Sequence, residues 1–319
     1  MKRVFLTLCV LLSFTLFLSA RGRKQESRDG TGREGVRVLT TIFPPYDFVR
    51  EIGGGTVNLS MLLPPGAESH SFEPSPRDII NIQNSDIFIY NGGESDVWVD
   101  RILSSMDRGN KKIIRLMDCV DVVEEEIVEG MQEEEEEEDG EGEAEYDEHV
   151  WTSPANAKRI VLKISDVLCE ADRANAPLYR DNTAAYLEKL DELDRAFRET
   201  LSRGTRKTLV FGDRFPFRYF ADAYGLSYFA AFPGCSTETE ASAATIAFLI
   251  NKVRQEKIPV VFHIELSNEK IADTICQETG AKKGLFHAAH NVSKREFESG
   301  ATYLGIMTKN VEILREALR

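Results

Sequence analysis

The sequence predicts an α/β protein with two lobes, each built on a mostly parallel sheet, joined by one long rigid helix. In both halves of the chain, short apolar runs rich in β-branched residues alternate with amphipathic segments of helical period. Such alternation is typical of parallel sheets whose two faces are covered by helices. One amphipathic stretch without strand-like runs separates the halves at residues 177–203. With 319 residues, the chain is long enough for two lobes.

The first half contains three expected strands, each followed by a cluster of proline or glycine. These strands are residues 36–42, 57–63 and 86–90. Helices are expected between them, over residues 46–52 and 77–83. Ser75 and Pro76 begin the second helix, since serine caps helix starts and proline fits the first turn.

Two helical segments follow. The first begins at Ser153 and Pro154 and has apolar residues three and four apart. The second, residues 177–203, carries one apolar stripe among charged residues and is the expected connecting helix. At about 1.5 Å per residue it is long enough to span a small domain.

The alternation of strands and helices then resumes. Strands are expected over residues 209–211, 226–232 and 259–264. Helices are expected over residues 217–224, 239–257, 267–279 and 301–318. The predicted organisation is a signal segment (1–20), a flexible linker (21–35), a first lobe (36–176), the connecting helix (177–204) and a second lobe (205–319).

The net charge of −14 comes from one acidic tract inside the first lobe. Residues 124–148 include sixteen Asp and Glu and no Lys or Arg. Like charges repel and the tract has little apolar area to bury, so we expect a mobile loop. The rest of the chain has no basic face interleaved with aromatic residues, which argues against binding nucleic acid.

The first residues have the pattern of an export signal. Lys2 and Arg3 precede an apolar run over residues 4–18, and small residues follow at Ser19 and Ala20. No later stretch reaches the roughly 20 apolar residues that a transmembrane helix needs. We therefore expect an exported protein, either periplasmic or at the cell surface.

The cysteines indicate neither a zinc knuckle nor a dense disulfide framework. Cys9 lies in the apolar run of the signal segment, and the other four, Cys119, Cys169, Cys235 and Cys276, are far apart. One disulfide among these four is compatible with the sequence, and its pairing stays open.

The five histidines lie at strand ends or just before helices. His70 and His149 each precede a helix that begins with Ser-Pro, and His263, His287 and His290 follow strands of the second lobe. Ligands of doubly wound sheets bind beyond the carboxyl ends of the strands, and several imidazoles together suit a transition metal. Spacing alone leaves two alternatives, a metal site and ordinary loop histidines.

Over nearly all of its mature length, the chain resembles the metal-binding subunits of zinc- and manganese-type ABC importers, a group that includes adhesin-like lipoproteins. The resemblance rests on residues 38–44 (VLTTIFP), 65–75 (PGAESHSFEPS), 147–154 (DEHVWTSP), 219–226 (YFADAYGL) and 302–304 (TYL). It implies two Rossmann-like lobes tied by a rigid helix, with a metal held between them and delivered to a membrane permease and its ATPase.

The resemblance implies the ligands residue by residue. His70 and His149 match the two histidines of the family's first lobe. His287 falls where the family has an acidic ligand, and a third imidazole there favours Zn²⁺ over Mn²⁺. The fourth ligand position falls on Gly212 or Arg214, neither of which binds a metal.

Three further residues are candidates with less support. Asp213, between Gly212 and Arg214, is the nearest side chain able to bind a metal; it could instead pair with Arg214 or cap a helix. Glu265 is a ligand or an acceptor that orients an imidazole, and His290 is a lesser candidate. Arg214 would repel a cation unless Asp213 or Glu265 holds its charge.

The resemblance therefore predicts a monomeric, non-enzymatic carrier that binds Zn²⁺, with Mn²⁺ as the alternative. An adhesin or structural module without a metal, and a zinc hydrolase with Glu265 as its base, are the competing hypotheses. The chain has no HExxH or GxSxG motif that would support a hydrolase. Arg21 stands where lipoprotein relatives have a lipid-bearing cysteine, which argues against a lipid anchor.

Overall fold

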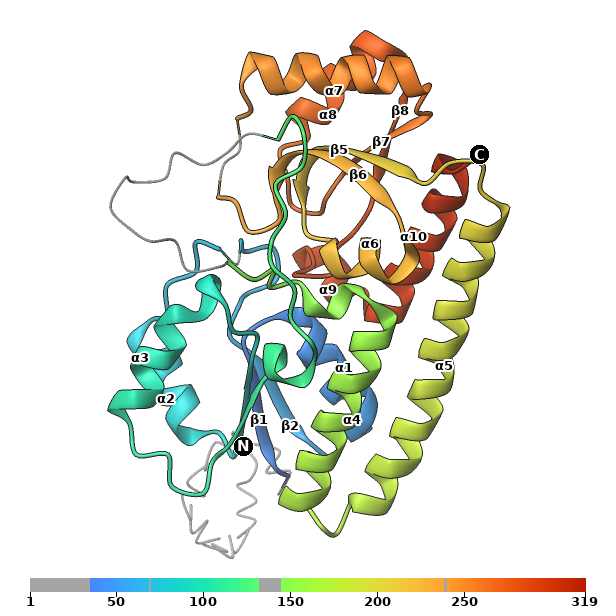
Figure 1. The fold of residues 1–319 in the computed structure, drawn as a ribbon. Helices are drawn as coiled ribbons and strands as arrows, with labels where there is room; N and C mark the ends of the chain where they lie inside the picture. Colours follow the sequence, from blue (N-terminus) through green and yellow to red (C-terminus); the bar gives the residue numbers. More distant parts are fainter. Residues whose placement is uncertain (1–34, 69, 132–144, 238–239) are drawn as a thin grey trace, which may run out of the picture. The chain divides into compact units, whose positions relative to one another are not determined.

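A computed structural model describes residues 35–68, 70–131, 145–237 and 240–319 (Figure 1). It contains two four-stranded sheets, with strand orders β2-β1-β3-β4 and β6-β5-β7-β8, and all pairs of neighbouring strands are parallel. The predicted α/β class with two parallel sheets is therefore confirmed. The expected signal segment, residues 1–20, lies outside the described residues, as do residues 21–34 of the expected linker.

The two sheets are built alike. The first consists of β1 (Arg37–Thr40), β2 (Asn58–Met61), β3 (Ile87–Tyr90) and β4 (Lys112–Arg115). The second consists of β5 (Thr208–Phe215), β6 (Ser227–Pro233), β7 (Val260–His263) and β8 (Lys282–Leu285). In each sheet the strand order reverses beside the first strand, and ligands of such sheets bind at this point, beyond the carboxyl ends.

Four α-helices belong to the first lobe. They are α1 (Phe43–Gly53), α2 (Pro76–Asn84), α3 (Val97–Ser105) and α4 (Pro154–Ala171). Helix α1 starts three residues before the predicted helix because Pro44 and Pro45 lie in its first turn, where no amide donor is needed. Gly54 ends it in the left-handed conformation, at φ 55°.

The connecting helix α5 (Ala176–Arg203) has 28 residues and is about 42 Å long. It lies along α1 and α4 of the first lobe and along the C-terminal helix α10 (Tyr303–Ala317) (Figure 1). Its buried face includes Tyr179, Tyr186 and Phe197, the stripe that the sequence shows. One helix thus packs against elements from both ends of the chain.

The remaining α-helices are α6 (Arg218–Tyr224), α7 (Ala243–Glu256), α8 (Lys270–Thr279) and α9 (Lys294–Glu298). The sequence predicts that α8 starts at Ser267, but the helix begins at Lys270. Its N-cap is Glu269, which has a φ of 58° and makes no capping hydrogen bond through its side chain. The Ser267 hydroxyl instead accepts a hydrogen bond from the amide of Glu269, at 3.3 Å.

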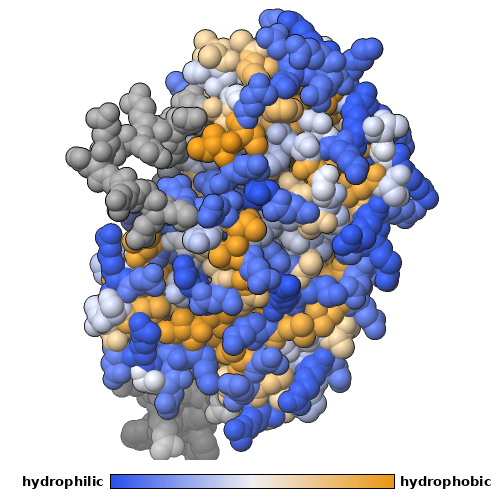
Figure 2. All heavy atoms as spheres, viewed as in Figure 1, coloured by the Kyte–Doolittle hydropathy of each residue, from blue (hydrophilic) through white to orange (hydrophobic). Residues whose placement is uncertain are grey.

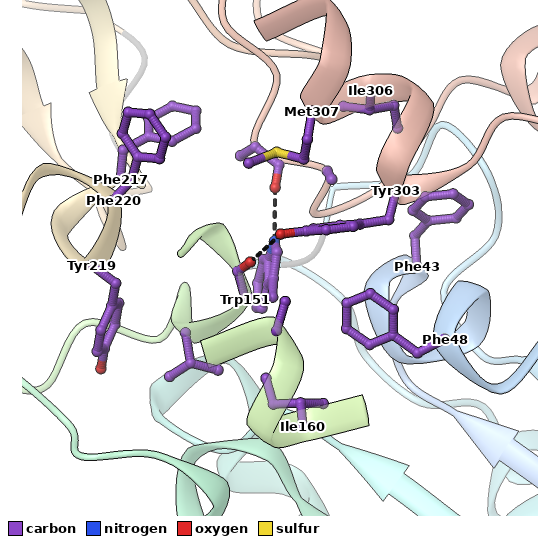
Figure 3. Packing of buried hydrophobic residues seen from close by; sticks show 14 of the residues in the cluster. Phe43, Phe48, Trp151, Ile160, Phe217, Tyr219, Phe220, Tyr303, Ile306 and Met307 are labelled. Atoms are coloured by element: carbon purple, nitrogen blue, oxygen red, sulfur yellow. Dashed lines mark hydrogen bonds between the residues drawn. The ribbon is translucent and has the colours of Figure 1, made fainter. Parts of the chain in front are cut away.

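A hydrophobic cluster continues through both lobes (Figure 3). The Tyr303 hydroxyl donates to the carbonyl of Trp151, at 2.7 Å, and the Trp151 indole donates to the carbonyl of Ala288, at 2.7 Å. Trp151 comes from the 3₁₀ turn η3 (Val150–Thr152) of the first lobe, whereas Ala288 and Tyr303 belong to the second. The lobes therefore share a buried, hydrogen-bonded contact.

Asp47 makes a second buried contact between the lobes. Its carboxylate accepts a hydrogen bond from the amide of Tyr303, at 2.6 Å, and pairs with Arg50. Arg50 in turn donates to the carbonyl of Ala301, at 2.7 Å. Helix α1 is thus tied to the start of α10 by a carboxylate and a guanidinium.

Part of the acidic tract belongs to the described residues. Glu124 and Tyr146 form an antiparallel bridge, and Glu125 accepts a hydrogen bond from the amide of Cys235 in the second lobe, at 2.9 Å. The mobile loop expected for this tract concerns chiefly residues 132–144, which lie outside the described residues. Cys119, Cys169, Cys235 and Cys276 are free thiols.

Hydrophilic side chains cover much of the face drawn in Figure 2, with hydrophobic ones in smaller patches among them. Within the described ranges, no helix combines the length and the apolar character needed to cross a bilayer.

Candidate metal centre

Three imidazoles converge between the two lobes. His70, His149 and His290 each offer a ring nitrogen, and these three atoms lie within 4.8 Å of one another. The ring centroids are 5.8 Å apart for His70 and His149, 5.3 Å for His70 and His290, and 5.2 Å for His149 and His290. We call these residues the imidazole triad. It is the one convergent group of three or more potential metal ligands among the residues described.

Each member of the triad follows a strand or precedes a helix. His70 lies in the turn between β2 and α2, where Ser75 and Asp78 form a capping box at the start of α2. His149 is the residue before the turn η3, and His290 lies in the loop between β8 and α9. The first lobe thus contributes two imidazoles and the second lobe contributes one.

Side chains of the first lobe orient two of the rings. Nδ1 of His70 lies 2.8 Å from the hydroxyl of Ser95, and Nδ1 of His149 lies 3.3 Å from a carboxylate oxygen of Asp147. Nε2 is therefore the nitrogen that each ring has available for a metal. Second partners of this kind fix the tautomer and direction of metal-binding histidines.

The environment shifts the pKa values of the three rings in different directions. Burial, together with the charge of His149, lowers the pKa of His70 to about 3. Burial also holds the pKa of His290 well below its usual value. Burial acts against the charged form of His149 too, but the Asp147 carboxylate outweighs it and raises that pKa. His70 and His290 are therefore neutral at pH 7, the form that binds a metal.

Glu265 braces the loop that carries His290. One carboxylate oxygen accepts the amide of His290, at 2.9 Å, and the other accepts the amide of Ala288, at 2.7 Å. Burial disfavours its charged form, but His287 and these amide donors keep the pKa of Glu265 below its usual value. Of the two roles that the sequence allows for Glu265, these contacts favour the acceptor that holds a ligand in position.

His287 does not join the triad, contrary to its rank in the sequence analysis. Its Nδ1 accepts a hydrogen bond from the amide of Ala289, at 2.9 Å, and lies 3.3 Å from Glu265. Its Nε2 is buried, lies 3.9 Å from Glu296, and has no hydrogen-bond partner among the described residues. Ala289 has a φ of 60°, so the chain turns between positions 287 and 290. The turn brings His290, the lesser candidate, to the other two imidazoles.

Asp213 is also apart from the triad. Its carboxylate accepts the amides of Arg214, at 2.9 Å, and Ile264, at 3.3 Å, and thereby joins β5 to the end of β7. It lines a different cavity from the triad. His263 is apart as well, with Nδ1 3.0 Å from the carbonyl of Ile264. Both residues make local structural contacts outside the triad.

The cavity at the triad, which we call the inner cavity, also contains an ion pair. Arg214 and Glu68 line it with the three imidazoles. The two terminal nitrogens of Arg214 lie 3.2 Å and 3.4 Å from the Glu68 oxygens. One of these nitrogens also donates to the carbonyl of Ser236, at 3.2 Å. The sequence offers Asp213 or Glu265 as a partner able to hold the charge of Arg214, but in the structure Glu68 pairs with it.

Sequence reasoning missed Glu68, Ser95 and Asp147 as contributors to the site. Glu68 and Asp147 lie two residues before His70 and His149, so their closeness in sequence was an available signal. Ser95 belongs to the 3₁₀ turn η1 (Glu94–Asp96) after β3 and had no such signal.

A family model matches nearly all of the described region. The model for "Zinc-uptake complex component A periplasmic" matches residues 38–317. The chain is similar to the high-affinity zinc uptake system protein ZnuA of Bacillus subtilis, with 32% identity over 316 residues, or 98% of this chain and 97% of that protein.

Similarity to longer proteins covers only part of them. The chain is 32% identical to the zinc-binding lipoprotein AdcA of Streptococcus pneumoniae over 319 residues, which are 99% of this chain and 61% of AdcA. The crystal structure of the Zn(II)-bound ZnuA-like domain of that AdcA gives a TM-score of 0.73 at 30% identity, covering 89% of this chain and 99% of that domain. The chain thus belongs to the family of periplasmic component A of zinc-uptake complexes.

Proposed function

We propose that this protein is an extracytoplasmic carrier that binds one Zn²⁺ between its lobes and delivers it to the permease of an ABC importer. The observation that carries the proposal is the convergence of His70, His149 and His290 from both lobes. The names of the similar proteins, zinc uptake protein ZnuA and zinc-binding lipoprotein AdcA, support zinc as the cargo.

The donor set also supports zinc. Imidazole nitrogen is a good ligand for Zn²⁺, at about 2.0–2.1 Å, whereas carboxylate and water oxygens suit Mn²⁺ better. Three donors at this bond length in a tetrahedral shell would lie about 3.3 Å apart. The triad nitrogens lie within 4.8 Å of one another, so small movements of the rings would suffice.

The contacts of Glu265 argue against a hydrolase. A zinc hydrolase needs a base that reaches metal-bound water. Both oxygens of Glu265 accept backbone amides, and one of them also faces His287. The carboxylate imagined as the base is therefore occupied in holding the loop. We infer a binding role without catalysis.

Export and delivery complete the proposal. The family description places its members in the periplasm, and the export pattern of residues 1–20 agrees with this location. We infer that the protein acts as a monomer, with a permease and its ATPase as partners.

Calorimetric titration of metal-free protein tests the proposal. We expect about one equivalent of Zn²⁺ to bind, also after deletion of residues 132–144, and a strong preference for Zn²⁺ in competition with Mn²⁺. His149→Ala should weaken binding strongly, and His263→Ala, which alters a histidine outside the triad, should leave it unchanged. Loss of tight binding on deletion of the acidic residues, or preference for Mn²⁺, would contradict the proposal.

A further inference from the structure

A second cavity adjoins the inner one. This outer cavity has a volume of about 550 Å³, against about 340 Å³ for the inner cavity, and both volumes include space open to solvent. It lies near the start of α8, where Ser267 and Asn268 line it. The two cavities have three lining residues in common, Glu68, Arg214 and Leu266. These three side chains therefore form the wall between the imidazole triad and the outer cavity.

The ion pair in this wall joins the two lobes. Glu68 belongs to the turn after β2, and Arg214 belongs to β5. Arg214 is fixed, because its side chain is only 11% exposed and it also donates to the carbonyl of Ser236 in its own lobe. Glu68 is 40% exposed, and besides Arg214 it accepts a long hydrogen bond from the amide of His70, at 3.4 Å. Glu68 is therefore the partner that can move away from the wall.

Leu266 adds a third feature to the wall. Its side chain is 41% exposed, and its backbone has a φ of 59°, a conformation that side chains with a Cβ rarely adopt. Such backbone strain is found at functional segments more often than elsewhere. The loop between β7 and α8 thus holds an exposed apolar side chain beside the ion pair.

The charges of the pair bear directly on a passing cation. A guanidinium facing the inner cavity repels Zn²⁺, but the Glu68 carboxylate compensates this charge while the pair is closed. When the pair opens, the carboxylate can face the cation while the fixed guanidinium stays with Ser236. A closed pair thus blocks the passage of a cation through the shared wall without adding a net charge to that wall.

We propose that Glu68 and Arg214 form a closing pair through which Zn²⁺ passes between the outer cavity and the imidazole triad. This inference rests on the proposed function, because it assigns two residues to the exchange of the metal held there. The pair sets how fast metal enters and leaves, whereas the triad sets how tightly it is held.

Stopped-flow kinetics of the full-length protein test the closing pair. Zinc release is followed by mixing the zinc-loaded protein with a fluorescent chelator, and zinc entry by mixing metal-free protein with Zn²⁺. We expect the double variant Glu68→Gln/Arg214→Gln, which removes both charges of the pair, to speed both entry and release by about fivefold, which is what a partly exposed ion pair is worth. Its dissociation constant should stay within about twofold of that of the wild type, because no net charge is added or removed beside the triad.

A control variant removes an equivalent contact elsewhere. Arg37→Gln breaks an exposed ion pair between β1 and Asp86, which lies at the opposite ends of the strands from the triad, and should leave both rates unchanged. Arg214→Lys keeps the charge but loses the two-pronged contact, so its rates should be intermediate. Thermal unfolding of each variant checks that it is folded.

Three results would overturn the closing pair. Unchanged rates in the double variant would exclude the pair from the exchange route. Weaker equilibrium binding in the double variant would make Glu68 a ligand. Tighter binding in the double variant with slower release would make Arg214 a simple repelling charge. Each of these leaves stoichiometric zinc binding by the wild-type protein intact, so failure of this inference is distinguishable from failure of the proposed function.

Discussion

The two lobes have the same strand order but support the candidate metal centre in different ways. In the first lobe, side chains hold the imidazoles, through Ser95 for His70 and Asp147 for His149. In the second lobe, Glu265 holds the backbone on both sides of Ala289 and thereby places His290. A fold repeated twice in one chain can thus present a ligand through a side-chain partner or through the conformation of a loop.

The largest expected effect distinguishes two histidines of the second lobe. His290→Ala should weaken Zn²⁺ binding by about a thousandfold, because it removes one of the few ligands that share the binding free energy. His287→Ala should change the affinity far less, since its ring faces Glu265 and Glu296. Competition with a chelator of known affinity measures both. Equal losses in the two variants would contradict the triad.

The second prediction concerns the buried contact between the lobes. The pKa of Asp47 is raised to about 6 by burial, so its carboxyl group favours folding most when protonated. This contribution is fully present below its ordinary pKa of 3.8 and is lost as the pH rises through about 6. We expect the free energy of unfolding of the wild type to fall by about 2–3 kcal/mol relative to Asp47→Asn between pH 4 and pH 7.

Urea unfolding of metal-free protein at both pH values measures this difference. The control is Asp86→Asn, which alters an exposed carboxylate of the same lobe, paired with Arg37. A gap between wild type and Asp47→Asn that stays constant with pH would show that burial does not dominate at Asp47.

The third prediction tests the brace in the second lobe. Glu265→Gln replaces an oxygen acceptor by an amide donor that faces backbone N–H groups, so the loop carrying His290 should lose its position. We expect zinc affinity to fall about 10- to 100-fold, the usual effect of removing such a partner.

Asp213→Asn is a matched control for Glu265→Gln. Asp213 also accepts two backbone amides in the second lobe, but it does not line the inner cavity. The Asp213→Asn substitution should reduce the stability of the protein and leave its zinc affinity within about threefold of that of the wild type. Equal losses of affinity in the two variants would show that the brace has no specific role.

The smallest effect is expected from the first lobe. Ser95→Ala removes the hydroxyl beside Nδ1 of His70, and we expect a loss of zinc affinity of about tenfold. Calorimetry measures it, with Ser104→Ala on the exposed side of α3 as the control. A loss as large as that of Glu265→Gln would mean that the two lobes depend equally on these partners.

Much of the fold could be predicted because most of its strands are apolar runs flanked by turn residues. Strand β3 is buried at every position, and its sequence IFIY shows it. Strand β8 has the sequence KKGL and buries only Gly284, so no apolar period marks it. Strand β4, with the sequence KIIR, and helix α3 were missed as well. Strands β4 and β8 lie at the edges of their sheets. They form by pairing with a neighbouring strand, which local sequence patterns do not encode.

Prediction of the candidate site from the sequence was incomplete for a similar physical reason. His70 and His149 lie beside Ser-Pro helix starts, so local sequence indicates their positions. The choice between His287 and His290 depends on a turn at Ala289, which Glu265 holds from 23 and 25 residues away. The partner of Arg214 is 146 residues away, at Glu68. Contacts over such distances are set by tertiary structure.

Trp151 gives the protein an optical signal of its own. The indole is fully buried, and its ring lies 5.5 Å from that of His149 and 4.9 Å from that of His290. The chain has two tryptophans, so Trp98→Phe would leave a single emitter beside imidazoles from both lobes. Ultraviolet fluorescence of such a variant would report occupancy by the cation in real time, without any attached dye.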